Sequence, residues 1–120
     1  MTEARPSIAD KRRTFRQMHE AGCFVIPNPW NVGSARYLQV TVEAMSRDVA
    51  VMESLKNFEP AVRNDLVMLF SGQDNATLMT VDGKEKLRAA TLAIIRKVLD
   101  SEGGNGKLIE AVYFTSFVIQ

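Results

Sequence analysis

The stretch Leu38-Gln-Val-Thr-Val-Glu-Ala44 decides the fold class of this chain of 120 residues. Its apolar residues stand at positions 38, 40, 42 and 44, and they alternate with Gln39, Thr41 and Glu43. Such alternation is typical of a β-strand that packs one face on a core and exposes the other face to water. We therefore expect a strand over residues 38–44, with a sheet built around it.

Two further apolar segments complete the expected sheet. Upstream, Cys23-Phe-Val-Ile26 reads as a short buried strand that is bounded by Pro27. A connector rich in Pro, Asn and Gly, residues 28–33, follows it, so we expect this strand to pair with residues 38–42. The chain ends in residues 108–119, which are rich in aromatic and β-branched residues. They predict a long terminal strand beside residues 38–42, covered on much of both faces.

Helical patterns occupy the rest of the chain. Ser7 and Asp10 resemble a capping box and predict a helix over about residues 8–21 that Gly22 ends. After the second strand we expect a helix that begins at an N-cap Ser46, a helix from Pro60 to Gly72, a short turn capped by Asn75, and a long helix over residues 81–101 capped by Thr80. This order predicts an α+β fold, a small sheet of about three strands with helices packed on one side.

Two amphipathic stripes identify the faces of these helices that should meet the sheet. The first consists of Val62, Leu66, Leu69 and Phe70, and the second of Leu87, Thr91, Ile94, Ile95, Val98 and Leu99. The basic residues of the long helix, Lys84, Lys86, Arg88, Arg96 and Lys97, lie mainly outside the second stripe. We expect a solvated face there, and a protein- or lipid-facing surface is the alternative.

Composition excludes several functional classes. Hydrophobic residues make up 46% of the chain and charged residues 24%, as in one ordinary globular domain. Fifteen basic and fourteen acidic residues give a net charge of +1, which argues against a nucleic-acid surface. One cysteine and one histidine exclude an internal disulfide and His-His metal motifs. The chain shows no transmembrane stretch and no secretory signal, so taken literally it would stay in the cytoplasm.

Candidate chemical groups favour a structural interpretation. His19 and Cys23 are four residues apart, but Gly22 should end the helix between them, and two ligands are too few for a stable zinc site. We therefore expect an exposed histidine and a buried free cysteine. No carboxylate pair or phosphate-binding loop is indicated, and the Gly-rich segment 103–106 is expected to be a mobile connector. We predict no catalytic, cofactor-binding or metal-binding residue, no cofactor, and no enzymatic activity.

The terminal aromatic residues Tyr113, Phe114 and Phe117 have two interpretations. The simpler one places them in the core, and truncating Phe117 to alanine would then cost about 3–5 kcal/mol of stability. The other makes them the edge of a partner site, because a C-terminal strand can lie at the border of a sheet.

Residues 36–120 resemble the periplasmic domain of the flagellar basal-body-associated FliL family. The resemblance is carried by four stretches, Arg36-Tyr-Leu-Gln-Val-Thr-Val42, Val62-Arg-Asn-Asp-Leu-Val-Met-Leu-Phe-Ser71, Gly83-Lys-Glu-Lys-Leu-Arg88 and Val112-Tyr-Phe-Thr-Ser-Phe-Val-Ile-Gln120. It implies a stomatin/prohibitin-like domain of a single-pass inner-membrane protein. The family motif makes Tyr113, Phe114, Thr115, Phe117 and Gln120 the candidate interaction residues.

The same resemblance implies a function and its partners. Family members associate with the flagellar stator, MotA and MotB, support motility and swarming, and are not enzymes. We therefore expect the basal body and stator as partners, a homo-oligomer, no nucleic acid, and membrane attachment on the periplasmic side through an anchor that this chain lacks.

Residues 1–35 resemble a different family, the isocitrate lyase/phosphoenolpyruvate mutase family. The resemblance rests on residues 11–36, most specifically on Asn28-Pro-Trp30 and Gly33-Ser-Ala35. It implies the first helix and strand of a barrel that cleaves C–C or P–C bonds of 2-oxo acids, but one βα unit cannot assemble that active site. A truncated, inactive lyase is thus the alternative function. A natural fusion, an engineered chimera and a gene-model error all remain open, and residues 24–26 can replace the first strand that the FliL-like part lacks.

Overall fold

The computed structural model describes residues 16–27 and 37–119 of the chain. Three strands, β1 (Gln17–Pro27), β2 (Tyr37–Ser46) and β3 (Ala111–Ile119), form an antiparallel sheet in the order β1-β2-β3. The expected pairing of the first two strands is confirmed, since Phe24 lies opposite Val40 and Ile26 lies opposite Leu38. The terminal strand also lies beside β2 as expected, with Phe117 opposite Val40.

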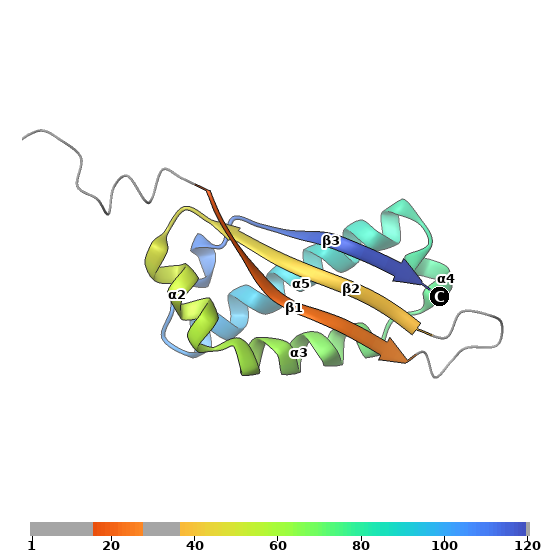
Figure 1. Cartoon of the computed structure of the whole chain (residues 1–120), viewed down its shortest axis with the longest axis horizontal. Helices are drawn as coiled ribbons and strands as arrows, with labels where there is room; N and C mark the ends of the chain where they lie inside the picture. The colour runs from red at the N-terminus through yellow and green to blue at the C-terminus, as the bar shows by residue number, and fades with distance from the viewer. Residues whose placement is uncertain (1–15, 28–36, 120) are drawn as a thin grey trace, which may run out of the picture.

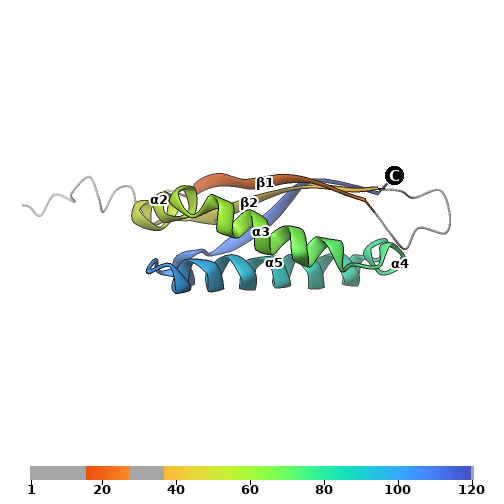
Figure 2. The ribbon, with the colours of Figure 1, turned by 90° about the horizontal axis from the view of Figure 1, so that it is seen from below.

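The helices follow β2 and cover one face of the sheet. They are α2 (Val49–Asn57), α3 (Glu59–Ser71), α4 (Asn75–Leu78) and α5 (Val81–Ser101), and a 3₁₀ turn, η1 (Gly106–Leu108), leads into β3. Figure 1 shows the sheet in front of α5, and Figure 2 shows α3, α4 and α5 on the same side of it. Helix α3 packs under β1, and α5 packs under β3. The predicted α+β architecture is therefore confirmed.

The expected N-terminal helix is wrong where it can be compared with the structure. Residues 17–21 belong to β1, and residues 8–15 lie outside the described residues. The apolar residues of the expected helix, Ile8, Phe15 and Met18, form too sparse a stripe to hold it on a core. The strand that carries the buried Phe24 and Ile26 extends back through residues 17–21 instead. The expected C-cap glycine serves the strand instead. Gly22 has a φ of +153°, which favours glycine, and it follows a bulge in the register between β1 and β2.

The observed helix caps confirm one expectation and correct another. Thr80 caps α5, because its hydroxyl accepts a hydrogen bond of 2.9 Å from the backbone N–H of Gly83. The cap of α2 is Asp48 and not Ser46, since the Asp48 carboxylate accepts from the N–H of Val51 at 3.1 Å. Ser46 is buried at the end of β2. Its hydroxyl donates to the carbonyl of Leu108 at 2.7 Å and thereby ties the strand to the segment before β3.

The core lies between the inner face of the sheet and the apolar stripes of α3 and α5. On β2 the alternation predicted from the sequence is observed, because Leu38, Val40, Val42 and Ala44 are buried. The helix stripes are confirmed as well, although two of their members, Leu69 and Ile94, are only partly buried. The buried residues of these stripes are Val62, Leu66, Phe70, Leu87, Thr91, Ile95, Val98 and Leu99.

The expectation that β3 is covered on both faces is wrong. Its outer face carries Tyr113 and Val118, which are 42% and 41% exposed. Aromatic and β-branched residues favour a strand whether or not both of its faces are covered, so their density does not reveal coverage. In the described part of the chain no helix is both long and apolar enough to cross a membrane.

Candidate functional site: a groove between β3 and α5

The motif residues predicted from the sequence lie on β3, at an edge of the sheet. Between this strand and α5 is a groove of about 510 Å³. The groove brings three of the predicted residues together with three side chains from the first half of α5. It is lined by Lys84, Glu85, Arg88, Tyr113, Phe114 and Phe117.

A bulge in β3 shapes the wall of this groove. Phe114 lies opposite Val42 and Ser116 lies opposite Thr41, so Thr115 is an extra residue without a partner position on β2. The extra residue resets the alternation of the strand. As a result Phe114 and Phe117 both lie on the helical side, with ring centroids 5.5 Å apart, while Thr115 is exposed.

Four phenylalanine rings connect the groove to the core. The Phe114 ring contacts Phe70 edge to face at 6.4 Å between centroids, and Phe70 contacts Phe24 of β1 in the same way at 5.1 Å. Edge-to-face pairs of this kind stabilise beyond the area that they bury. The groove wall therefore rests on packed core residues and not on a loop.

The charged residues of α5 divide into a structural pair and an available cation. Arg88 donates to the Glu85 carboxylate at 2.7 Å and to the carbonyl of Val112 at 3.3 Å, which joins α5 to β3. The hydrogen bond from Arg88 lowers the pKa of Glu85, and their Coulomb attraction lowers it further. Lys84, by contrast, forms no ion pair with a described residue, and its ammonium lies 5.3 Å from the centroid of the Phe117 ring.

These contacts correct the expectation of a wholly solvated basic face. Arg88 is half-buried, and Arg96 donates two hydrogen bonds to the carbonyl of Ile109, at 3.0 and 2.7 Å. Sequence reasoning missed Lys84, Glu85 and Arg88 as groove residues. Their position along the helix could have indicated this role. Lys84 and Arg88 lie next to Leu87 of the inner stripe on the helix surface, and a long side chain there can reach a neighbouring strand.

The remaining predicted residues are placed as follows. Thr115 lies on the bulge, Tyr113 lies at the rim of the groove, and Gln120 falls outside the described residues. The expectation for His19 and Cys23 is reversed, since the cysteine is exposed while the histidine turns inward, with Nε2 3.7 Å from Oε1 of Glu59. The bulge between the two residues puts them on opposite faces of β1.

The side chains of the groove can dock a partner side chain. Its carboxylate, Glu85, is engaged by Arg88, and its walls are aromatic. Among residues 16–27 and 37–119, no group of three His, Cys, Asp or Glu side chains is placed to hold a metal ion. An aromatic wall with a cation above it can receive an apolar side chain and an acidic group together.

Comparisons with known proteins identify the relatives of this chain. Residues 24–120 match the model of the family described as flagellar basal body-associated protein FliL. The flagellar protein FliL of Aquifex aeolicus is 30% identical over 84 residues, which are 70% of this chain and 49% of that protein. The flagellar protein FliL of Escherichia coli K12 is 32% identical over 91 residues, 75% of this chain and 58% of that protein.

Two consequences follow from the extent of these matches. The chain spans about half the length of the relatives that it matches, since the aligned parts cover 49% and 58% of them. The family match begins at Phe24, so it includes the second half of β1, which supplies an edge of the sheet. The lyase resemblance of residues 1–35 finds no support in these comparisons.

Proposed function

The chain belongs to the FliL family of flagellar basal body-associated proteins, and from this premise we propose that it is a non-enzymatic docking domain that associates with the motor stator. The stator proteins MotA and MotB are the proposed partners, and support of motility and swarming is the proposed role. The observation that carries the proposal is the groove between β3 and α5. It gathers the family-motif residues Tyr113, Phe114 and Phe117 beside the cation of Lys84.

The chemistry of the groove indicates what its partner should offer. Phe114 and Phe117 form a rigid apolar wall, because their rings contact each other and the core ring of Phe70. Lys84 has no acidic partner among the described residues and is free to meet a carboxylate. A stator segment that carries an apolar side chain next to an acidic one would satisfy both features.

The proposed location follows the family. We place the domain on the periplasmic side of the bacterial inner membrane, held by an anchor outside the described residues, and we propose that several copies assemble around the stator. The division of the chain into residues 1–35 and 36–120 also stays a prediction, although β1 in the first part and β2 in the second form one sheet.

A charge reversal in the groove tests this proposal. The chain is joined to the membrane anchor of a FliL protein and expressed in flagellated cells that lack their own FliL. Lys84→Glu should reduce swarming on stiff agar and recovery of MotB after chemical crosslinking, because it places a negative charge over the aromatic wall. The matched control is Lys97→Glu, on the same helix at an exposed position outside the groove.

The two variants separate a groove defect from a general charge effect. Both should keep the thermal unfolding midpoint of the parent domain, since both lysines are exposed. Swarming that is lost with Lys84→Glu and kept with Lys97→Glu supports the proposal. If both strains swarm equally well, or lose swarming equally, the groove is not the site through which the protein acts.

A further inference from the structure

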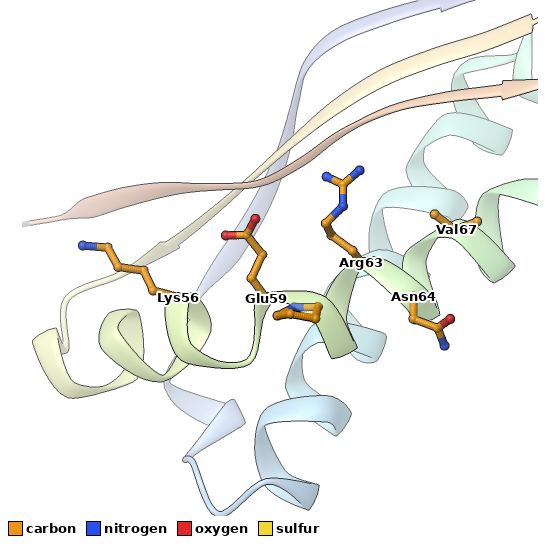
Figure 3. A pocket seen from close by; sticks show the side chains of 6 residues that line it. Lys56, Glu59, Arg63, Asn64 and Val67 are labelled. Atoms are coloured by element: carbon orange, nitrogen blue, oxygen red, sulfur yellow. The ribbon is translucent and has the colours of Figure 1, made fainter.

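A second groove lies along α2 and α3, on the side of the molecule where β1 is the edge strand of the sheet. Its volume is about 660 Å³, compared with about 510 Å³ for the groove between β3 and α5. Figure 3 shows Glu59 and Arg63 extending from α3 toward the strand, with Lys56 at one end and Val67 at the other. The groove is lined by Lys56, Glu59, Pro60, Arg63, Asn64 and Val67.

The strand beside this groove has an open edge. Within residues 16–27 and 37–119, β1 pairs with β2 alone, so its other edge has no strand partner among these residues. The opposite edge of the sheet is different. There Arg88 donates a hydrogen bond to the carbonyl of Val112, and the bulge at Thr115 interrupts the strand. Open edges are the places where a sheet accepts another strand, whereas bulges and capping side chains prevent it.

The charge available in this groove is positive. Arg63 is half-buried, its guanidinium lies 5.0 Å from the centroid of the Phe24 ring, and it forms no ion pair with a described residue. Lys56 pairs with the exposed Glu53 of its own helix, with 3.7 Å between Nζ and Oε2. The acidic residue of the groove, Glu59, faces His19 at 3.7 Å. An arginine guanidinium without an acidic partner among the described residues can receive a carboxylate through two parallel hydrogen bonds.

We propose that this groove binds an extended acidic segment of a partner protein, which pairs with the open edge of β1 as a fourth strand and places a carboxylate on Arg63. The backbone pairing supplies affinity, and the contact with Arg63 selects acidic sequences. The site is separate from the β3 groove, so it stands whether or not that groove binds the stator.

Selection of short peptides tests the proposal on the full chain. A random peptide library displayed on phage is selected against the immobilised protein, and the enriched peptides are synthesised and titrated by fluorescence anisotropy. We expect enrichment of acidic sequences with alternating apolar residues. Binding should weaken by about tenfold in Arg63→Gln, as expected for a lost charge-assisted hydrogen bond, and change little in the control Lys97→Gln.

Two further measurements locate the bound peptide. Amide hydrogen exchange of residues 22–27 should slow on binding, and peptides methylated on alternate backbone nitrogens should lose affinity. Because Arg63 also packs on Phe24, Lys56→Gln serves as a second variant that leaves this packing intact and should weaken binding to a smaller extent.

Several outcomes would overturn the proposal. They are a library that yields no saturable binder, peptides that bind Arg63→Gln and Lys56→Gln as tightly as the parent, and protection that appears on β3 instead of β1. Self-association of the chain that acidic peptides do not displace would identify a second copy as the occupant and would equally contradict the proposal.

Discussion

Phe70 and Phe117 belong to the same series of contacting rings but differ in burial. Phe70 is 2% exposed and lies at the centre of the series, whereas Phe117 is only partly buried at the edge of the sheet. Phe70→Ala should therefore cost the full amount for a buried phenylalanine, about 3–5 kcal/mol, and Phe117→Ala about half of that. Urea unfolding of the two variants measures the difference. Equal costs would mean that Phe117 is a core residue, as one interpretation of the sequence has it.

Gly83 shows how packing can reverse a helix preference. In isolation an alanine would favour the first turn of α5 by about 1 kcal/mol over glycine. In the structure a Cβ at this position would collide with the backbone carbonyl of Thr77. We expect Gly83→Ala to lower the melting temperature, with Ala89→Gly, at an exposed site of the same helix, as the reference for pure propensity. A higher melting temperature in Gly83→Ala would contradict this expectation, because it would mean that α4 can move away from α5 at little cost in stability.

At the residue scale, local chemistry could be predicted where one local rule applies. Thr80 is correctly identified as a cap, because both partners of its hydroxyl, the N–H of Gly83 and the carbonyl of Thr77, are close in sequence. Ser46 was misassigned because Asp48 can also cap α2, and the choice depends on the carbonyl of Leu108, 62 residues away. The faces of His19 and Cys23 depend on a bulge that leaves no mark in the pattern of apolar residues.

Strand β1 is an integral part of the sheet and not an appendage. It contributes Ala21, Phe24 and Ile26 to the core, and it provides one edge of the pairing with β2. Deleting residues 1–33 should therefore unfold the domain or lower its melting temperature strongly, because buried apolar area is lost and Phe70 is uncovered. Circular dichroism on heating checks this. An unchanged melting curve would show that the rest of the chain folds without β1.

The Glu85–Arg88 pair is expected to make the α5–β3 contact sensitive to acid. The pKa of Glu85 is lowered by its hydrogen bond to Arg88. A group whose folded-state pKa is depressed stabilises the fold above its unfolded pKa and loses that contribution as the pH falls through the folded value. Glu85→Gln should thus be slightly less stable than the parent near neutral pH and equal to it in strong acid. A stability difference that persists in acid would contradict this cause.

At the scale of elements, the periodicity of apolar residues predicts whether most segments are helices or strands. It does not predict which of their faces other elements cover. The alternation in β2 and the stripes of α3 and α5 were read correctly, because each pattern extends over several turns or alternations. The helix expected over residues 17–21 rests on capping signals and a sparse apolar stripe, which are weaker evidence than a full stripe. The open outer face of β3 could not be predicted, since coverage depends on what lies across from a strand and not on its own residues.

The described part of the chain is a sheet with helices on one face (Figures 1 and 2). One groove lies between β3 and α5, and another lies along α2 and α3. The α+β class could be predicted from the order of the patterns. The grooves could not, because they depend on which strands are the edges and on which helix lies beneath each. Only the residues on β3 were anticipated, through their resemblance to a family motif, and their neighbours on α5 were not.

Photo-crosslinking from Thr115 tests the central claim most directly. This residue is exposed on the bulge of β3, so a photoreactive amino acid in its place should not disturb the core. The chain, joined to a FliL membrane anchor in swarming cells, should yield an adduct with MotA or MotB on irradiation, whereas the same probe at Met68, exposed on α3, should not. Adducts from Met68 but not from Thr115, or from neither, would contradict a stator contact through the β3 groove.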